Sequence, residues 1–479
     1  MAALAFAPGL FFGQAYSAND LLDYFGNSRV FLRDQLFQGR FPLWAPHLYG
    51  GQPFFANPNS MMAYPLNYPT LLFTIPYGFT VFFFIHMALS GLGMRFWLKA
   101  WGLGERACGV GALLYALSGF FWFHLPQPNL LAIYAGFPWL LGCLERFLRT
   151  RERQWAFLTG LSFAVIFCAG NFQSATCVLY TGLAYFLFSL FALPGKDRHS
   201  RVFSLKNWGI GALFALWGGL PLLVQLIPTH EFYLNSFRSN TGLTYDNFAG
   251  TFSMVPKATY QFLFPYLGVP AGTTLEKALQ VFDHPNDKDN DFSGVFGYLG
   301  IWAPFLMALA FRQKEKKRVL FLAGLGLASL LTAWGHYFPL HRLECLLLPG
   351  IGLSRAPYRF IETYVLFASA LSAFGFQNLE QMLAGKKVPR LWAAGSVLYL
   401  FILLGFSFLN PEQTWREMAA LLLGGMGLFL WAFHKSTKRG HWVFMAAALF
   451  PLLLNGWAAL AGARLPITTS RRISRPSST

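Results

Sequence analysis

The chain has 479 residues, of which 55% are hydrophobic, 18% aromatic and only 12% charged. A soluble domain has about a quarter of its residues charged, because its surface needs polar cover. This composition excludes an ordinary water-soluble enzyme and predicts a protein that lies mostly in lipid. The formal net charge of +17 does not indicate nucleic-acid binding, because the Lys and Arg residues stand in short runs between apolar stretches. The five cysteines form no CxxC pair, so neither a zinc site nor a disulfide framework is indicated.

Apolar windows about 20 residues long, the length that crosses a bilayer as a helix, recur along the chain. We expect an all-α polytopic membrane protein with about 13 (11–13) transmembrane helices. In chain order, the expected spans are 2–16, 68–94, 107–123, 130–147, 155–170, 173–193, 208–228, 295–311, 319–334, 358–377, 391–409, 417–433 and 442–461. No soluble module interrupts them. We therefore expect one transmembrane domain over 1–463, followed by a basic, Ser-rich and disordered tail at 464–479.

Basic residues cluster in alternate loops, for example at 146–153 and 312–318. Such loops face the cytoplasm in most membrane proteins. This pattern predicts a multi-pass protein of the cytoplasmic (inner) membrane with a cytoplasmic N-terminus. Most Asp and Glu residues then fall on the extracytoplasmic side. The expected outer segments are a large first loop at 17–67, a turn at 124–129, a second large loop at 229–294 and a shorter loop at 335–357.

The first outer loop is the most informative segment. Asp20 and Asp23 follow the first apolar stretch, and their spacing places both carboxylates on one face if 19–38 is helical. Apolar and basic residues along 29–38 follow an amphipathic pattern, as in a helix that lies in the membrane interface. The stretch 39–69 is rich in Gly, Pro and aromatic residues, which predicts a structured loop at the membrane surface rather than a helix.

Several motifs in a fixed order resemble one family. After the loop acid comes GRFPLWAPHLYGGQPFFANPNSMMAYP, followed by LSGFFWFHLPQPNLLAIYAGFPWLLGCLERF, AGNFQSATCVLY, VQLIPTHEFYLNSFR, GYLGIWAPFLMAL and LPGIGLSRAPYRF. Together they resemble the YfhO-like bacterial membrane proteins, which belong to the GT-C class of glycosyltransferases. The resemblance covers nearly the whole chain. Two features depart from it: Asn19 stands where the family often has Gly, and many relatives continue beyond residue 479.

The resemblance implies an enzyme that transfers a sugar from a polyprenyl-phosphate-linked donor to an extracytoplasmic acceptor, namely a cell-envelope glycopolymer, a glycolipid or a protein. In this class an acid of the first outer loop is the characteristic catalytic group. Asp20 is our first candidate and Asp23 the second. A carboxylate there can take the proton of the attacking hydroxyl. Alternatively, it can position the acceptor or hold a divalent cation that bridges the phosphate.

The leaving lipid phosphate gains negative charge, which cationic donors near the outer interface would stabilise. Arg355 and Arg359 are the candidates for donor-phosphate binding, and snorkelling to lipid headgroups is their alternative role. A spacing of four would put both on one helical face, although Pro357 indicates that the helix begins there. His124, at an outer helix end, is expected to bind the phosphate or a sugar hydroxyl, or to be a structural cap. Further substrate-binding candidates are Gln52, Asn57 and Glu231.

No P-loop or GxGxxG motif occurs, so direct use of a nucleotide has no support. The expected partners are membrane lipid, a polyprenyl-phosphate sugar and an extracytoplasmic glycan, lipid or protein acceptor. Two alternatives stay open. One is a transporter or flippase of lipid-linked intermediates, which would carry ionisable residues inside its spans. The other is a non-catalytic protein of envelope assembly.

Overall fold

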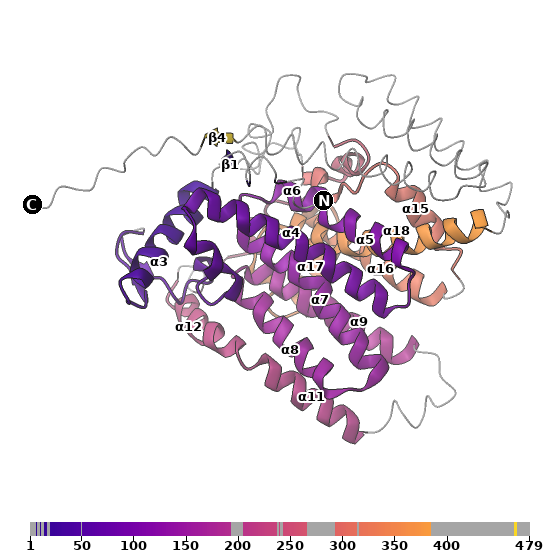
Figure 1. The fold of residues 1–479 in the computed structure, drawn as a ribbon, viewed down its shortest axis with the longest axis horizontal. Coiled ribbons are helices and arrows are strands. Elements are labelled where there is room, and N and C mark those ends of the chain that lie inside the picture. Colours follow the sequence, from indigo (N-terminus) through magenta and orange to yellow (C-terminus); the bar gives the residue numbers. More distant parts are fainter. Residues whose placement is uncertain are drawn as a thin grey trace, which may run out of the picture.

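The computed structural model is mainly helical, and its strands are short (Figure 1). It describes residues 6, 10, 14–16, 20–48, 50–192, 205–236, 239, 243–265, 293–313, 316–384 and 464–466. The expected spans 391–409, 417–433 and 442–461, and most of 2–16, lie outside the described residues.

The first loop folds into a small unit of its own at the left of Figure 1. Its elements are the π-helix η1 (Leu21–Gly26), α3 (Asn27–Phe37), the paired strands β2 (Trp44–Ala45) and β3 (Gln52–Pro53), and the 3-10 helices η2 (Pro58–Ser60) and η3 (Pro65–Leu72). Five side chains form its core: Leu32, Ala45, Phe54, Met62 and Leu71. The helical stretch expected over 19–38 is thus present, and the segment after it is an ordered, largely non-helical loop.

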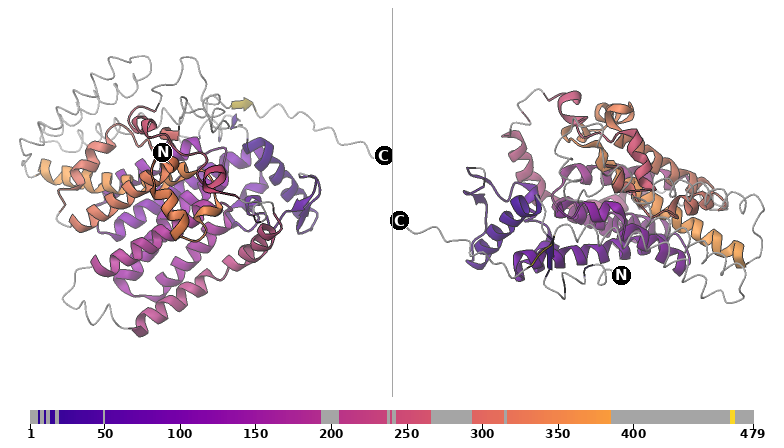
Figure 2. Two further views of the ribbon diagram at one scale, coloured as in Figure 1. Left: turned by 180° about the vertical axis from the view of Figure 1, so that it is seen from behind. Right: turned by 90° about the horizontal axis from the view of Figure 1, so that it is seen from above.

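The central bundle follows the loop. Its first part consists of α4 (Ile75–Ala100), α5 (Glu105–Ala116), α6 (Gly119–Phe123), α7 (Pro128–Thr150), α8 (Arg153–Cys168), α9 (Phe172–Ala192), α11 (Leu205–Gly219) and α12 (Leu222–Leu234). Helix α4 packs against α5 and α7, α7 packs against α8, and α8 packs against α11. Figures 1 and 2 show these helices side by side, with α11 at the edge of the bundle.

The second part supplies irregular segments and one long central helix. In order, the elements are η4 (Tyr245–Ala249), η5 (Pro256–Phe262), η7 (Ser293–Gly297), α15 (Ala303–Ala310), α16 (Lys316–Ala333), η8 (Gly335–Tyr337), α17 (Leu340–Leu347), η9 (Ile351–Leu353), η10 (Pro357–Phe360) and α18 (Ile361–Ala384). Helix α18 packs against α5, α15 and α16, so most of its side chains are buried. At the start of the expected tail, β4 (Arg464–Pro466) pairs antiparallel with β1 (Gln14–Tyr16).

Within the described ranges, four helical stretches are long and apolar enough to cross a membrane: Ile75–Ala100, Glu105–Phe123, Pro128–Thr150 and Pro357–Ala384. A fifth is present if Gly211–Gly219 and Leu222–Leu234, which meet at a bend of 60°, form one broken span. The expected count of about 13 is therefore not confirmed, but the helices are those of a multi-pass membrane protein.

One expected span is interrupted. Of 295–311, only Ala303–Ala310 is α-helical, and the segment begins in the separate 3-10 helix η7. There the backbone approaches its neighbours too closely for larger residues. A Cβ at Gly294 would lie 1.9 Å from the carbonyl oxygen of Ala258, and one at Gly297 would lie 2.3 Å from the ring of Phe262.

The two ends of the bundle differ in chemistry. At one end, basic and acidic side chains of the expected cytoplasmic loops pair. Arg95 and Lys99 both contact Glu105, and Arg106 lies 3.2 Å from Glu380. These pairs are largely exposed, so each adds little stability. The described parts of the segments expected to be extracytoplasmic meet at the opposite end, where Gln127 contacts Asp20 and the backbone of Ala356 bonds to that of Thr251.

Candidate active site at one end of the helix bundle

The first loop is attached to the bundle by buried and half-buried amides. Asn129, in the first turn of α7, donates from Nδ2 to Oδ1 of Asn59 (2.9 Å). Gln225 of α12 donates from Nε2 to the carbonyl oxygen of Phe55 (3.1 Å). These bonds hold residues 55–59 against two helices that are distant in sequence. The loop therefore has a defined position over this end of the bundle.

A close backbone contact makes the attachment tighter. Gly170, in the turn between α8 and α9, has φ +100°, and a Cβ there would lie 2.0 Å from the carbonyl oxygen of Pro58. Only glycine suits both the left-handed backbone and the space. The backbone of the α8–α9 turn thus lies directly against the backbone of the first loop.

Of the two candidate acids, Asp20 faces the bundle more directly. It is exposed, precedes η1, and its Oδ2 accepts a hydrogen bond from Nε2 of Gln127 at 3.4 Å. Gln127 belongs to the turn that joins α6 to α7. Asp23 is exposed as well, and within the described part of the chain it is its backbone oxygen, not its carboxylate, that accepts a hydrogen bond, from Nδ2 of Asn27 at 2.8 Å. The geometry therefore favours Asp20 as the acid that faces a second structural segment.

His124 lies in the same α6–α7 turn and is only 3% exposed. Its Nδ1 lies 2.9 Å from the carbonyl oxygen of Phe120, and its ring is 4.4 Å from that of Phe296. Burial, with a smaller effect of the charge on Arg359, lowers the pKa of His124 to about 3. The ring is therefore neutral near pH 7. Because a carbonyl only accepts, Nδ1 carries the proton, and Nε2 is left as an acceptor.

This Nε2 has no hydrogen-bond partner among the residues that the structure describes. A neutral ring with a free acceptor does not suit a phosphate oxygen, which also only accepts. It suits a hydroxyl group, which can donate to it. As the C-cap of α6 with its Nδ1 bonded to Phe120, His124 fits the expected structural cap, and its remaining acceptor suits a hydroxyl better than a phosphate.

Arg359 is half-buried at the end of η10 and is oriented by a neighbouring helix. Its Nη1 donates to Oε1 of Gln173 (3.2 Å), and Gln173 donates from Nε2 to the carbonyl oxygen of Ala356 (2.9 Å). Gln173 therefore bridges the first turn of α9 and the segment before α18. The Nε of Arg359 is buried without a hydrogen-bond partner in the described part of the chain.

Arg355 does not share a helical face with Arg359. Ala356 has φ +71°, and η10 begins only at Pro357, as Pro357 indicated. Arg355 is exposed and lies over the ring of Phe252, with its guanidinium carbon 5.2 Å from the ring centre. The two cations belong to the same segment but face different surroundings.

The remaining candidates occupy the first loop and α12. Asn57 is buried and donates from Nδ2 to Oη of Tyr24 (3.0 Å) and to Oε1 of Gln52 (3.4 Å), while its own Oδ1 accepts from the backbone of Asn59. These amides stabilise the loop. Glu231 is exposed near the end of α12. The structure brings none of these three into contact with Arg359 or His124.

Sequence reasoning missed Glu362. It follows Arg359 by one turn, is fully buried, and neither carboxylate oxygen has a hydrogen-bond partner among the described residues. Ser174, beside Gln173, is equally buried. The available signal was a charged residue inside an apolar run, which usually marks a functional position in a membrane protein. Gln127 carried no such signal, whereas Gln173 lies in the motif AGNFQSATCVLY.

No protein-family model matches the chain, and no curated protein sequence matches it, so membership of the YfhO-like family is not confirmed. Among solved structures, the chain is similar to ArnT from Cupriavidus metallidurans bound to undecaprenyl phosphate. The TM-score is 0.52 at 13% identity, over 96% of this chain and 75% of that one. The apo state of the same protein gives a TM-score of 0.48 at 12% identity, with the same coverage. The first similarity shows that this chain has an ArnT-like fold.

Proposed function

We propose that the chain is a membrane glycosyltransferase of the GT-C type. It transfers a sugar from a polyprenyl-phosphate-linked donor to a hydroxyl of an extracytoplasmic glycan, lipid or protein. The observation that carries this proposal is the arrangement at one end of the bundle. Exposed Asp20 contacts the turn that holds His124, and Arg359 is oriented close to that turn by Gln173. The ArnT-like fold, in a structure that binds undecaprenyl phosphate, supports the class of donor.

Asp20 is the proposed general base. The acceptor oxygen attacks the anomeric carbon, its proton passes to the Asp20 carboxylate, and the bond from that carbon to the phosphate oxygen breaks. The leaving lipid phosphate keeps the electron pair of that bond. The exposure of Asp20 leaves its carboxylate open to an acceptor. A divalent cation between this carboxylate and the phosphate is the alternative, and chelation with EDTA would distinguish the two.

Arg359 is the proposed donor to the leaving phosphate. One of its nitrogens is committed to Gln173, and the buried Nε is unused by the described residues, so the guanidinium is oriented but retains donors. Preorganised donors of this kind stabilise developing charge. Arg355, exposed on the ring of Phe252, is proposed as a second cation for the same phosphate. His124 is proposed to accept a hydrogen bond from a sugar hydroxyl.

The proposed orientation follows from the two ends of the bundle. The end that carries Asp20 would face outward, and the end with the ion pairs of Glu105 and Glu380 would face the cytoplasm, in line with the basic loops there. The N-terminus would then be cytoplasmic and the membrane the inner one. We also keep the proposed division into a transmembrane domain at 1–463 and a tail at 464–479.

One observation favours the second candidate function, a flippase of lipid-linked intermediates. Glu362 is an ionisable group inside the candidate span Pro357–Ala384, with no hydrogen-bond partner among the described residues. Such groups commonly line transport paths. A flippase would need Glu362 for lipid translocation and would not need Asp20 as a base. A glycosyltransferase would need Asp20, so the two functions predict different sensitive residues.

The test uses two matched variants, Asp20→Asn and Asp23→Asn, in membranes supplied with a radiolabelled polyprenyl-phosphate sugar. Removal of a general base typically costs about 10²–10⁴-fold in rate, so we expect at least about a hundredfold loss for Asp20→Asn and little change for Asp23→Asn. Transfer that survives in Asp20→Asn, while Glu362→Gln abolishes lipid translocation, would support the flippase instead.

A further inference from the structure

Helix α17 (Leu340–Leu347) has its polar and apolar faces reversed with respect to a soluble protein. His341 is 1% exposed, whereas Leu343, Leu346 and Leu347 are 50%, 78% and 67% exposed. In water such a helix would turn its leucines inward and its histidine outward. The sequence predicted an extracytoplasmic loop at 335–357, and this helix within it directs three leucines away from the protein.

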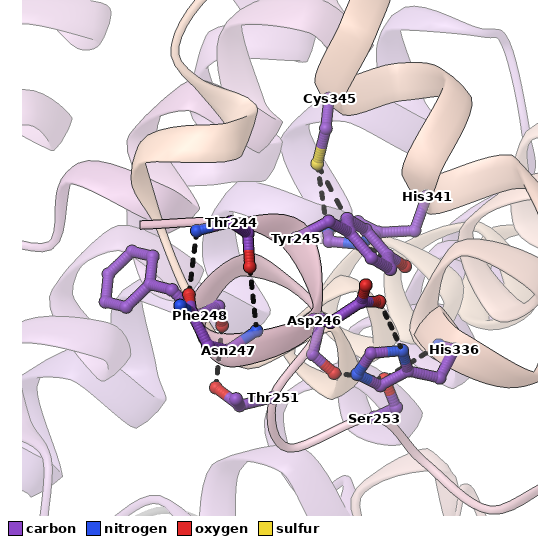
Figure 3. A network of polar contacts seen from close by, with 11 residues as sticks. Thr244, Tyr245, Asp246, Asn247, Phe248, Thr251, Ser253, His336, His341 and Cys345 are labelled. Atoms are coloured by element: carbon purple, nitrogen blue, oxygen red, sulfur yellow. Dashed lines mark hydrogen bonds and ion pairs between the residues drawn. The ribbon is translucent and has the colours of Figure 1, made fainter. Parts of the chain in front are cut away.

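The inner face of α17 explains why the polar residues turn inward. His341 lies with Nδ1 3.2 Å from Oη of Tyr245, and Sγ of Cys345 is 3.8 Å from Nε2 of the same ring. Figure 3 shows His341 and Cys345 beside Tyr245. On the same helix, Oε1 of Glu344 accepts from Oγ1 of Thr332 at 2.9 Å. His341, Cys345 and Oε1 of Glu344 thus have contacts inside the protein, Oε2 of Glu344 is buried without a hydrogen-bond partner among the described residues, and the leucines are left for the exterior.

The position of α17 is set by two long helices. Thr332 lies in the last turn of α16, and Tyr180 of α9 donates from Oη to the carbonyl oxygen of Pro349, just after α17 (2.7 Å). A Cβ at Gly350 would lie 3.4 Å from the ring of Phe172, the first residue of α9. Helix α17 therefore lies at the level where α9 begins and α16 ends.

Both neighbouring helices carry an apolar stripe on their exposed sides. On α9, Leu179, Leu183 and Leu187 are each nearly half exposed at four-residue spacing, which is one helical face. The ring of Phe188 on α9 stacks at 3.8 Å on that of Phe321 on α16, so the two helices adjoin. The leucines of α17 continue this apolar exterior at its end rather than interrupting it with polar groups.

The charges next to α17 suit the headgroup region of a bilayer. Arg342 is exposed, and its guanidinium carbon lies 5.4 Å from the ring centre of Tyr245. Arg355 is held in the same manner over Phe252. An interfacial helix typically combines an apolar face in the acyl region with basic residues at the phosphates. The arrangement matches that combination in both parts.

We propose that α17 lies in the lipid bilayer at the interface nearest Asp20, with Leu343, Leu346 and Leu347 among the acyl chains and Arg342 at the lipid phosphates. The partner of this surface is membrane phospholipid, and the inference does not depend on the proposed sugar transfer. The segment 335–357 is then a membrane-embedded wall of the protein rather than an aqueous loop. It carries Arg355 near its end and is followed directly by Arg359 in η10, so a lipid-borne substrate would reach both from within the leaflet.

The test is spin labelling of single introduced cysteines in nanodiscs made of phosphatidylcholine and phosphatidylglycerol. The parent is Cys345→Ala, because the other four cysteines are buried. Labels go to Leu346 and Leu347, with Leu183 of α9 as the lipid-facing control and exposed Gln154 as the aqueous control. Collision with oxygen is compared with collision with a water-soluble nickel chelate, and unlabelled parent protein reports background.

We expect the ratio of oxygen to nickel collision at Leu346 and Leu347 to resemble that at Leu183 and to exceed that at Gln154 several-fold. A ratio at both α17 positions equal to that at Gln154 would place the helix in water and overturn the proposal. Low collision with both reagents would mean that protein covers the helix, which also overturns it. Two label positions and an unchanged size-exclusion profile guard against a single misfolded variant.

Discussion

The close backbone contact between Gly170 and Pro58 can be tested by substitution, with Gly102 as a matched control. In Gly170→Ala, the alanine has to adopt a left-handed backbone at φ +100°, and its Cβ would lie 2.0 Å from the carbonyl oxygen of Pro58. In Gly102→Ala, φ is +85°, but no atom lies within 4 Å of the new Cβ. The two variants share the backbone strain and differ in the clash.

The expected magnitudes follow from these two terms. An L-residue in the left-handed region costs about 1–2 kcal/mol, which both variants suffer. Overpacking costs about 1–3 kcal/mol more where backbone must move, and only Gly170→Ala has that term. We therefore expect Gly170→Ala to be less stable than Gly102→Ala by about 1–3 kcal/mol. The clash would also shift the first loop, so sugar transfer should fall although Asp20 is intact.

The assay is thermal unfolding of both variants in one detergent, together with transfer activity below the unfolding temperature. Equal decreases in Tm for the two variants would refute the proposed backbone contact between the first loop and the α8–α9 turn. A larger decrease in Tm for Gly170→Ala with full activity would show that the loop position does not affect the chemistry.

Two further predictions concern charges. Arg359→Lys loses the planar guanidinium that contacts Gln173, so transfer should fall about tenfold or more, as one to two lost charged hydrogen bonds predict. Arg355→Lys, exposed on Phe252, should lose less, and equal losses would argue against Arg359 as the main phosphate ligand. Burial raises the pKa of Glu344 to about 7, above its unfolded value, so its contribution to stability is present below about pH 4.5 and is lost as the pH rises through 7. Tm measured from pH 5 to 8 should therefore decline less in Glu344→Gln. Burial lowers the pKa of His341 to about 4, so the stability that His341 contributes is present above about pH 6.5 and is lost as the pH falls through 4. If the dependence of Tm on pH is the same in Glu344→Gln as in the parent, the burial of the Glu344 carboxyl is refuted.

The sequence by itself determined the class of protein and the positions of the main helices. The expected spans 130–147 and 358–377 lie within α7 (Pro128–Thr150) and the stretch Pro357–Ala384. The physical reason is that backbone groups in lipid have to bond within their own segment, so a long apolar run can only be a helix. The amphipathic stretch 19–38 was readable for a similar local reason, because side chains three and four apart share a face.

Tertiary structure alone decided which of these residues meet. Asp20 contacts Gln127, and Gln173 contacts Arg359, across 107 and 186 residues of chain, and no local periodicity encodes such distances. The same holds for Asn57, which donates from Nδ2 to Oη of Tyr24 across 33 residues of chain.

The reversed polarity of α17 depended on tertiary structure as well. An eight-residue segment that contains leucine, histidine and glutamate is compatible with an aqueous loop and with a membrane surface, because the mean hydropathy averages over both faces of the helix. Only the contacts of Glu344 with Thr332 and of His341 with Tyr245 determine which face is internal. Sequence therefore determined which segments are helical in lipid, and long-range packing decided which side chains those helices bring together and which they turn outward.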